Sequence, residues 1–179
     1  MVFSVALSDG ARRREIVRAA MRILETDGRP ALTMRRLAAE MEMQAPSLYK
    51  HVADKEELEM LLIAEGFRDW SDELESAVVD VPVDLRLARL ATVYRRFALR
   101  RPHLYRLMTE GALPRERLPA GLEARAAAPL IEAADGPDAA RAIWAFAHGM
   151  SILELDGRFP PGADLDAAWR AGLAAFGER

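Results

Sequence analysis

Apolar residues recur at helical spacing along most of this chain. In residues 12–27 they lie three or four positions apart and would share one face of a helix. The members of this face are Ile16, Ala19, Ala20, Ile23 and Leu24. Gly28 is a natural C-terminal cap, and Pro30 bars continuation of the helix. We expect a helix from Arg12 to Asp27, preceded by a loose arm over residues 1–10.

Two shorter helices follow. Thr33 is a good N-cap for a helix that buries Leu37. The pattern breaks at residues 42–43, and a second helix opens near Gln44. Leu48 and Val52 of this second helix lie four apart and face inward, and its outward residues are Gln44, Ser47, Lys50 and His51. Two short helices with a tight turn predict a helix-turn-helix, whose second helix enters the major groove of DNA.

The rest of the chain also shows helical patterns. Asp54 is expected to cap a long helix that ends near Val79, with Glu57 at the capping-box position. Further helices are expected over residues 83–99, 103–108, 121–134 (broken or started late near Pro129), 138–156 and 164–176. No segment shows the sustained alternation of a strand. We therefore predict an all-α fold of about nine helices. Residues 1–55 would form a three-helix DNA-binding domain, and residues 56–179 a helical domain for effector binding and dimerisation.

Composition excludes several classes of protein. The chain has no cysteine and only three histidines, so disulfides and a zinc cage are not expected. No apolar run approaches the roughly 20 residues of a membrane span, and the first residues lack the features of a signal peptide. No Ser–His–acid arrangement, phosphate loop or ligand cluster stands out. We predict a cytoplasmic protein without a metal or cofactor that is not an enzyme.

Charge is distributed unevenly. The net charge is −3, yet residues 1–55 carry net +3 and the remainder net −6. Both lysines, Lys50 and Lys55, lie in the basic part. This asymmetry favours a nucleic-acid partner. A chance solvated face is the alternative reading.

Three segments resemble the DNA-binding domain of the TetR family of bacterial transcriptional regulators. They are LTMRRLA at 32–38, APSLYKHV at 45–52 and DKEEL at 54–58. RPHLYRLM at 101–108 and WAFAHG at 144–149 resemble the family's C-terminal domain of the Trp-His-Gly (WHG) type. One departure is Glu42, which stands in the turn where the family usually has glycine. A positive φ at Glu42 would be strained.

The resemblance implies roles for individual residues. Gln44, Ala45 and Pro46 would face base edges, where glutamine can bond adenine and small apolar groups can contact thymine methyls. The expected phosphate contacts, which fix register without reading sequence, are Thr33, Ser47, Tyr49, His51 and Lys55. Lys50 could contact either a base edge or a phosphate, and Arg35 is a further candidate DNA contact. The alternative is a purely structural helical hairpin.

The resemblance also implies an effector pocket and a homodimer. Candidate ligand contacts are Phe67, Trp70, Tyr94, Phe97, Tyr105, Met108, Trp144 and His148, although any one of them could simply be core. Candidate dimer contacts are Ala139, Ile143, Ala147, Met150, Leu165, Ala168, Trp169 and Leu173, with ordinary core packing as the alternative. The implied function is a repressor released from a palindromic operator by a small, largely apolar or aromatic ligand. Two alternatives are a helical binding or catalytic protein that retains the DNA-binding domain, and a DNA-binding protein with a filled core.

Overall fold

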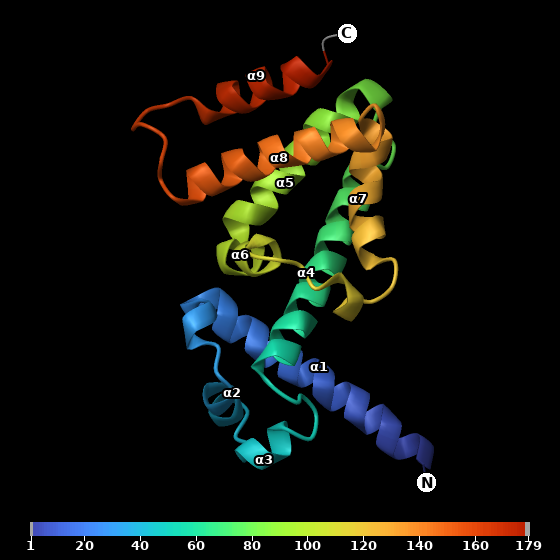
Figure 1. Ribbon diagram of the computed structural model, residues 1–179, viewed down its shortest axis with the longest axis vertical. Helices are drawn as coiled ribbons and strands as arrows, with labels where there is room; N and C mark the ends of the chain where they lie inside the picture. The colour runs from blue at the N-terminus through green and yellow to red at the C-terminus, as the bar shows by residue number, and fades with distance from the viewer. Residues whose placement is uncertain (1, 178–179) are drawn as a thin grey trace. The chain divides into compact units, whose positions relative to one another are not determined.

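The computed structural model describes residues 2–177, which form nine α-helices, two short 3-10 helices and no strand (Figure 1). The helices are α1 (Val2–Asp27), η1 (Arg29–Ala31), α2 (Met34–Glu40), α3 (Ala45–Leu48), α4 (Lys55–Val78), α5 (Val83–Arg100), α6 (Pro102–Thr109), η2 (Arg115–Arg117), α7 (Leu122–Ala133), α8 (Gly136–Leu155) and α9 (Leu165–Gly177). The predicted all-α fold is confirmed for this part of the chain.

The chain divides into two compact units. The first comprises Met1–Gly66 with His103–Pro119, and the second comprises Phe67–Pro102 with Ala120–Arg179. The boundary therefore falls inside α4. The sequence predicted a domain boundary at residue 55, whereas the structural boundary lies at residue 66. The difference arises because the start of α4 and most of α6 belong to the same unit as the N-terminal segment. The functional assignment of two domains remains a prediction.

Two predictions about helix extent are wrong. Residues 2–10 are part of α1 rather than a loose arm, because a helix gains one hydrogen bond for each residue added to a formed helix. Residue 1 lies outside the described residues. Pro129 does not break α7. Proline removes one backbone hydrogen bond, but Pro129 is buried on the same face as Leu122 and Ala126, so packing outweighs that loss.

The first unit is built around the apolar face of α1, which packs on α2 (Figure 1). Ile16 and Leu24 have no exposed surface, as the spacing predicted. The same unit buries Tyr105 of α6 completely. A Cβ atom on Gly66 would lie 2.5 Å from the Sδ atom of Met108. Glycine at this position therefore lets α6 approach α4 closely.

The second unit is centred on α5, which packs on α7, α8 and α9. Arg95 joins three of these helices. Its Nε and Nη2 donate to the two Glu154 oxygens of α8 at 2.8 and 2.7 Å, and its Nη1 donates to Asp166 of α9 at 2.5 Å. These carboxylates raise the pKa of Arg95, and Arg95 in turn lowers the pKa of Asp166. The paired charges hold α8 and α9 on α5.

Candidate nucleic-acid interface

The turn between α2 and α3 is held by backbone hydrogen bonds. Thr33 caps α2, since its Oγ1 accepts from the Arg36 amide at 3.2 Å. At the other end of α2 the Glu42 amide donates to the Ala39 carbonyl, and the Met43 amide donates to the Ala38 carbonyl at 2.8 Å. This pair of bonds is a Schellman motif, which needs a left-handed residue. Glu42 is that residue, with φ of 52°, at a cost of about 1 kcal/mol.

The two helices are fixed by a fully buried apolar set. Leu37 of α2, Leu48 of α3 and Val52 beyond it have no exposed surface. Helix α3 is shorter than predicted, but the chain continues as a turn to Val52, whose amide donates to the Leu48 carbonyl at 3.1 Å. The inward positions predicted for this segment are thus confirmed. They leave the opposite side of α3 facing solvent.

Every predicted DNA contact keeps accessible surface. The exposed residues are Thr33, Arg35, Gln44, Pro46, Tyr49 and Lys50, and the half-buried residues are Ala45, Ser47, His51 and Lys55. All ten lie on α2, α3, the adjoining turns and the first residue of α4 (Figure 1). Arg35 and Lys50 form no ion pair with any side chain that the structure describes. Their charges are therefore available to a polyanion.

The start of α4 is capped as predicted. The Asp54 Oδ1 accepts from the Glu57 amide at 2.7 Å, and the Glu57 Oε2 accepts from the Ala53 amide at 2.7 Å. The capping box therefore reaches back to Ala53 rather than to Asp54. The Asp54 carboxylate therefore occupies the first turn, where the Lys55 Nζ lies 3.7 Å from the Oε1 of Glu59.

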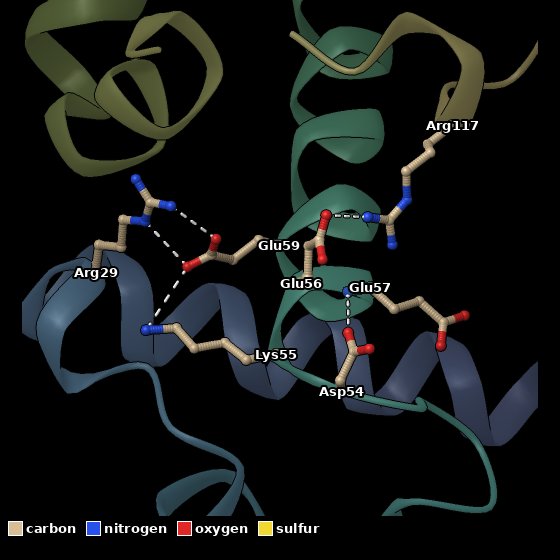
Figure 2. Close-up of polar contacts among 7 residues, drawn as sticks. All are labelled: Arg29, Asp54, Lys55, Glu56, Glu57, Glu59 and Arg117. Atoms are coloured by element: carbon tan, nitrogen blue, oxygen red, sulfur yellow. Dashed lines mark hydrogen bonds and ion pairs between the residues drawn. The ribbon is translucent and has the colours of Figure 1, made fainter. Parts of the chain in front are cut away.

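Three glutamates at the start of α4 each pair with a different segment. Glu56 pairs with Arg117 of η2, and Glu59 pairs with Arg29 of η1, as Figure 2 shows. Glu57 pairs with Arg13 of α1. The partners lie 61, 30 and 44 residues away in sequence, so local pattern reading could not find them. These pairs tie the first turns of α4 to the rest of its unit.

Three of the eight ligand candidates form one cluster. Trp70 of α4 contacts Tyr94 and Phe97 of α5 edge-to-face, with ring centroids 4.7 and 4.9 Å apart. Tyr105 and Met108 belong to the first unit instead. The remaining members outside the cluster are Phe67, Trp144 and His148. Trp144 is 49% exposed on α8, with the His148 ring 6.2 Å away, and burial lowers the pKa of His148.

The dimer candidates fall on two faces of α8 and α9. Ile143, Ala147 and Trp169 are at most 5% exposed within the single chain, so these three are core positions with no surface for a partner. The half-buried candidates are Ala139, Met150, Leu165, Ala168 and Leu173. The accessible face of α8 is instead a stripe, here called the α8 stripe, of Trp144, Ala145, His148, Gly149, Ile152 and Leu153. The predicted positions Ile143 and Ala147 are about one residue off this face, a rotation of roughly 100°.

The described residues hold neither a metal-binding cluster nor a membrane-length helix. No group of three or more acidic, histidine or cysteine side chains there could hold a metal ion. No helix in this range is long and apolar enough to cross a membrane.

Comparisons with known proteins match both units. The family described as "Bacterial regulatory proteins, tetR family" matches residues 16–58, and the "Tetracyclin repressor-like, C-terminal domain" matches residues 87–176. The chain is 30% identical over 165 residues to the uncharacterized HTH-type transcriptional regulator Rv0681 of Mycobacterium tuberculosis, covering 87% of this chain and 76% of that protein.

Solved structures agree with these matches. The structure of a protein with unknown function from Rhodococcus sp. RHA1 is 27% identical, with a TM-score of 0.75 over 92% of each chain. The multidrug binding protein EbrR, crystallised with imidazole, is 26% identical, with a TM-score of 0.65 over 89% of this chain and 92% of its own.

Proposed function

Because the chain belongs to the TetR family of DNA-binding transcriptional regulators, we propose that it is a repressor that a small molecule releases from a palindromic operator. The family is one of regulators rather than enzymes, as predicted. The Trp-His-Gly subtype remains a prediction. One observation carries the proposal. Gln44, Pro46 and Lys50 are exposed on a helix-turn-helix whose inner residues are fully buried.

We assign the DNA contacts to two groups. Gln44, Ala45 and Pro46 read base edges, because they open the recognition helix α3. The second group holds phosphates and fixes register. It contains the cations Arg35, Lys50 and Lys55, together with Thr33, Ser47, Tyr49 and His51. The free charges of Arg35 and Lys50 support this division.

Binding to DNA in a salt series tests the assignment. The duplex is the region flanking the protein's own gene, and binding is followed by fluorescence anisotropy. Each phosphate contact adds about 0.9 to the negative slope of log affinity against log salt. Lys50→Ala/Lys55→Ala should therefore weaken binding and flatten the slope by roughly 2. Equal slopes for the variant and the wild type would sink the assignment of both lysines.

The proposed dimer places two recognition helices on one operator. Palindromic sites require a two-fold symmetric protein with its helices about 34–36 Å apart. We propose that the α8 stripe supplies the contact. A Cβ on Gly149 would meet no other atom within 4 Å, whereas a Cβ on Gly172 would lie 2.2 Å from the Phe146 ring. Gly172 is thus required inside the chain, and Gly149 is free to admit a second helix closely.

The proposed effector acts on the second unit and is sensed through α4. Residues Lys55–Gly66 of α4 belong to the first unit, and Phe67–Val78 to the second. A ligand that displaces Trp70 from Tyr94 and Phe97 would shift α4 and change the spacing of the recognition helices. Such coupling is reciprocal and is typically worth about 1–3 kcal/mol. EbrR, a multidrug binding protein at 26% identity whose structure is complexed with imidazole, supports a small-molecule effector for this chain.

Tryptophan fluorescence separates a ligand site from a filled core. All three tryptophans, Trp70, Trp144 and Trp169, lie in the second unit. A Trp144→Phe/Trp169→Phe variant keeps only Trp70, so a change in its emission during a screen of aromatic compounds reports the predicted site. The same compounds should weaken DNA binding. A screen that moves neither signal would favour a DNA-binding protein without an effector.

A further inference from the structure

Lys55, the proposed phosphate contact at the start of α4, shares its carboxylate partner with a second cation. Its Nζ lies 3.7 Å from the Oε1 of Glu59, one turn further along α4. Arg29 of η1 donates to both oxygens of the same carboxylate, from Nε at 3.0 Å and from Nη2 at 2.8 Å. Figure 2 shows Glu59 between Arg29 and Lys55. One negative charge thus faces two positive charges.

The two ion pairs differ in tightness. The Arg29 pair is bidentate, which fixes the carboxylate in one orientation, and the side chain of Glu59 is only 12% exposed. Glu59 also raises the pKa of Arg29, with a smaller contribution from Glu110. The Lys55 contact, by contrast, is longer than a hydrogen bond. Lys55 can therefore leave Glu59 while Arg29 holds the carboxylate in place.

We propose that Glu59 is an internal counterion that limits how strongly Lys55 and Arg29 attract a DNA phosphate. The idea rests on the proposed function, since it takes Lys55 as a phosphate contact. A phosphate must compete with Glu59 for the ammonium group, and a carboxylate near the phosphate also repels it. An ion pair in a helix is weaker when the lysine precedes the glutamate by four residues than when it follows it. Because Lys55 precedes Glu59, its ammonium group can exchange Glu59 for a phosphate.

This role differs from that of the other two glutamates at the same helix end. Glu56 pairs with Arg117 and is 71% exposed, and Glu57 caps the helix and pairs with Arg13. Within the part of the chain that the structure describes, no ion pair joins either of them to Lys55 or Arg29. Glu56 therefore offers a matched control. Its replacement removes the same charge from the same two turns of α4 without freeing either cation.

The test compares Glu59→Gln with Glu56→Gln. The probe is a fluorescein-labelled random-sequence duplex of about 30 base pairs, since phosphate contacts carry no sequence information. Anisotropy is measured between roughly 50 and 200 mM salt. Glu59→Gln should tighten binding about three- to tenfold, and steepen the negative salt slope by about 1 to 2. Glu56→Gln should change affinity by less than about twofold.

A double variant shows whether the effect passes through the lysine. In a Lys55→Met background, most of the gain from Glu59→Gln should vanish, leaving only the share carried by Arg29. Thermal unfolding of each variant checks the fold. If Glu59→Gln proves unstable, Glu59→Asp withdraws the carboxylate from Lys55 and should tighten binding to a smaller degree.

The outcomes separate this inference from the proposed function. Wild-type binding with Glu59→Gln equal to Glu56→Gln would overturn the counterion role alone. Weaker binding by Glu59→Gln would overturn it too, and would show that Glu59 positions Lys55 for DNA. A wild type that fails to bind the duplex even at about 50 mM salt would overturn the proposed function, and the counterion role with it.

Discussion

The α2–α3 surface and the α8 stripe are both accessible, but they are built in opposite ways. The first is polar and rests on very short helices, which need a side-chain cap at Thr33, a Schellman turn and three buried aliphatic residues to hold their shape. The second is largely apolar and belongs to α8, which spans Gly136–Leu155. Trp144 and Leu153 expose 49% and 42% of their surface there.

This difference decides what each surface can bind. Exposed cations without an ion-pair partner in the chain can attract a hydrated polyanion. Exposed apolar side chains beside alanine and glycine suit another packed helix. On the first surface each polar side chain can form its own contact. On the second surface binding depends on the whole apolar face packing together. Substitutions should therefore act locally on the first surface and collectively on the second.

The largest expected effect comes from breaking the α8 stripe. Gly149→Arg fits the single chain, because nothing lies within 4 Å of its Cβ position, but it would place a charge in the proposed dimer contact. We expect a monomer by light scattering and operator binding weaker by about 100-fold or more, since one half-site remains. Ala127→Arg, on an exposed position of α7, is the control. A dimeric Gly149→Arg protein would mean that the chains meet elsewhere.

The next largest expected effect is on the free energy of unfolding, and it differs between a glycine inside the second unit and one on its surface. Gly172→Ala would drive a methyl group into the Phe146 ring, and overpacking typically costs about 1–3 kcal/mol. Gly149→Ala meets open space within the single chain, so at protein concentrations where the chains are monomeric it should stabilise α8 by about 0.5–1 kcal/mol. Urea unfolding of both variants measures the contrast. Equal changes in the free energy of unfolding would contradict the tight α8–α9 contact.

A smaller effect is expected beneath the DNA surface. Glu42→Gly removes the left-handed strain at φ of 52° but adds unfolded-state entropy, so we expect a net gain of less than about 1 kcal/mol. DNA affinity should change little, because the turn keeps its shape. Asp80→Gly, at φ of 56° after α4, is the matched control away from the DNA surface. A loss of stability in Glu42→Gly would show that the carboxylate makes a contact that offsets the strain.

The smallest effect is a pH dependence in the α8 stripe. Burial lowers the pKa of His148 in the folded chain, so the unfolded chain binds the proton more readily. The associated stability is complete above the ordinary pKa of about 6.5 and is lost as the pH falls below it. His148→Gln should flatten that part of the curve of unfolding free energy against pH. An unchanged curve would assign the acid sensitivity to other groups.

Local patterns predicted most of the fold and the outward polar residues of the α2–α3 surface. Helix spacing identified the buried faces of α1 and α3, and Asp54 was recognised as a cap because caps act within four residues. Local patterns did not decide the choices that depend on distant neighbours. Ile143 and Trp144 are adjacent on an apolar helix, and periodicity alone does not say which of them faces the chain's own core. Packing against α5 and α9 made that choice.

The sequence by itself determined the all-α architecture, the helix-turn-helix and its outward polar residues. These follow from hydrogen bonds and side-chain spacing within a few positions. Only the tertiary structure decided that α6 folds with the N-terminal segment, that Trp144 is exposed while Ile143 is buried, and that Glu59 lies between Lys55 and Arg29. Each depends on residues far apart in the chain, whose meeting is set by packing rather than by local preference.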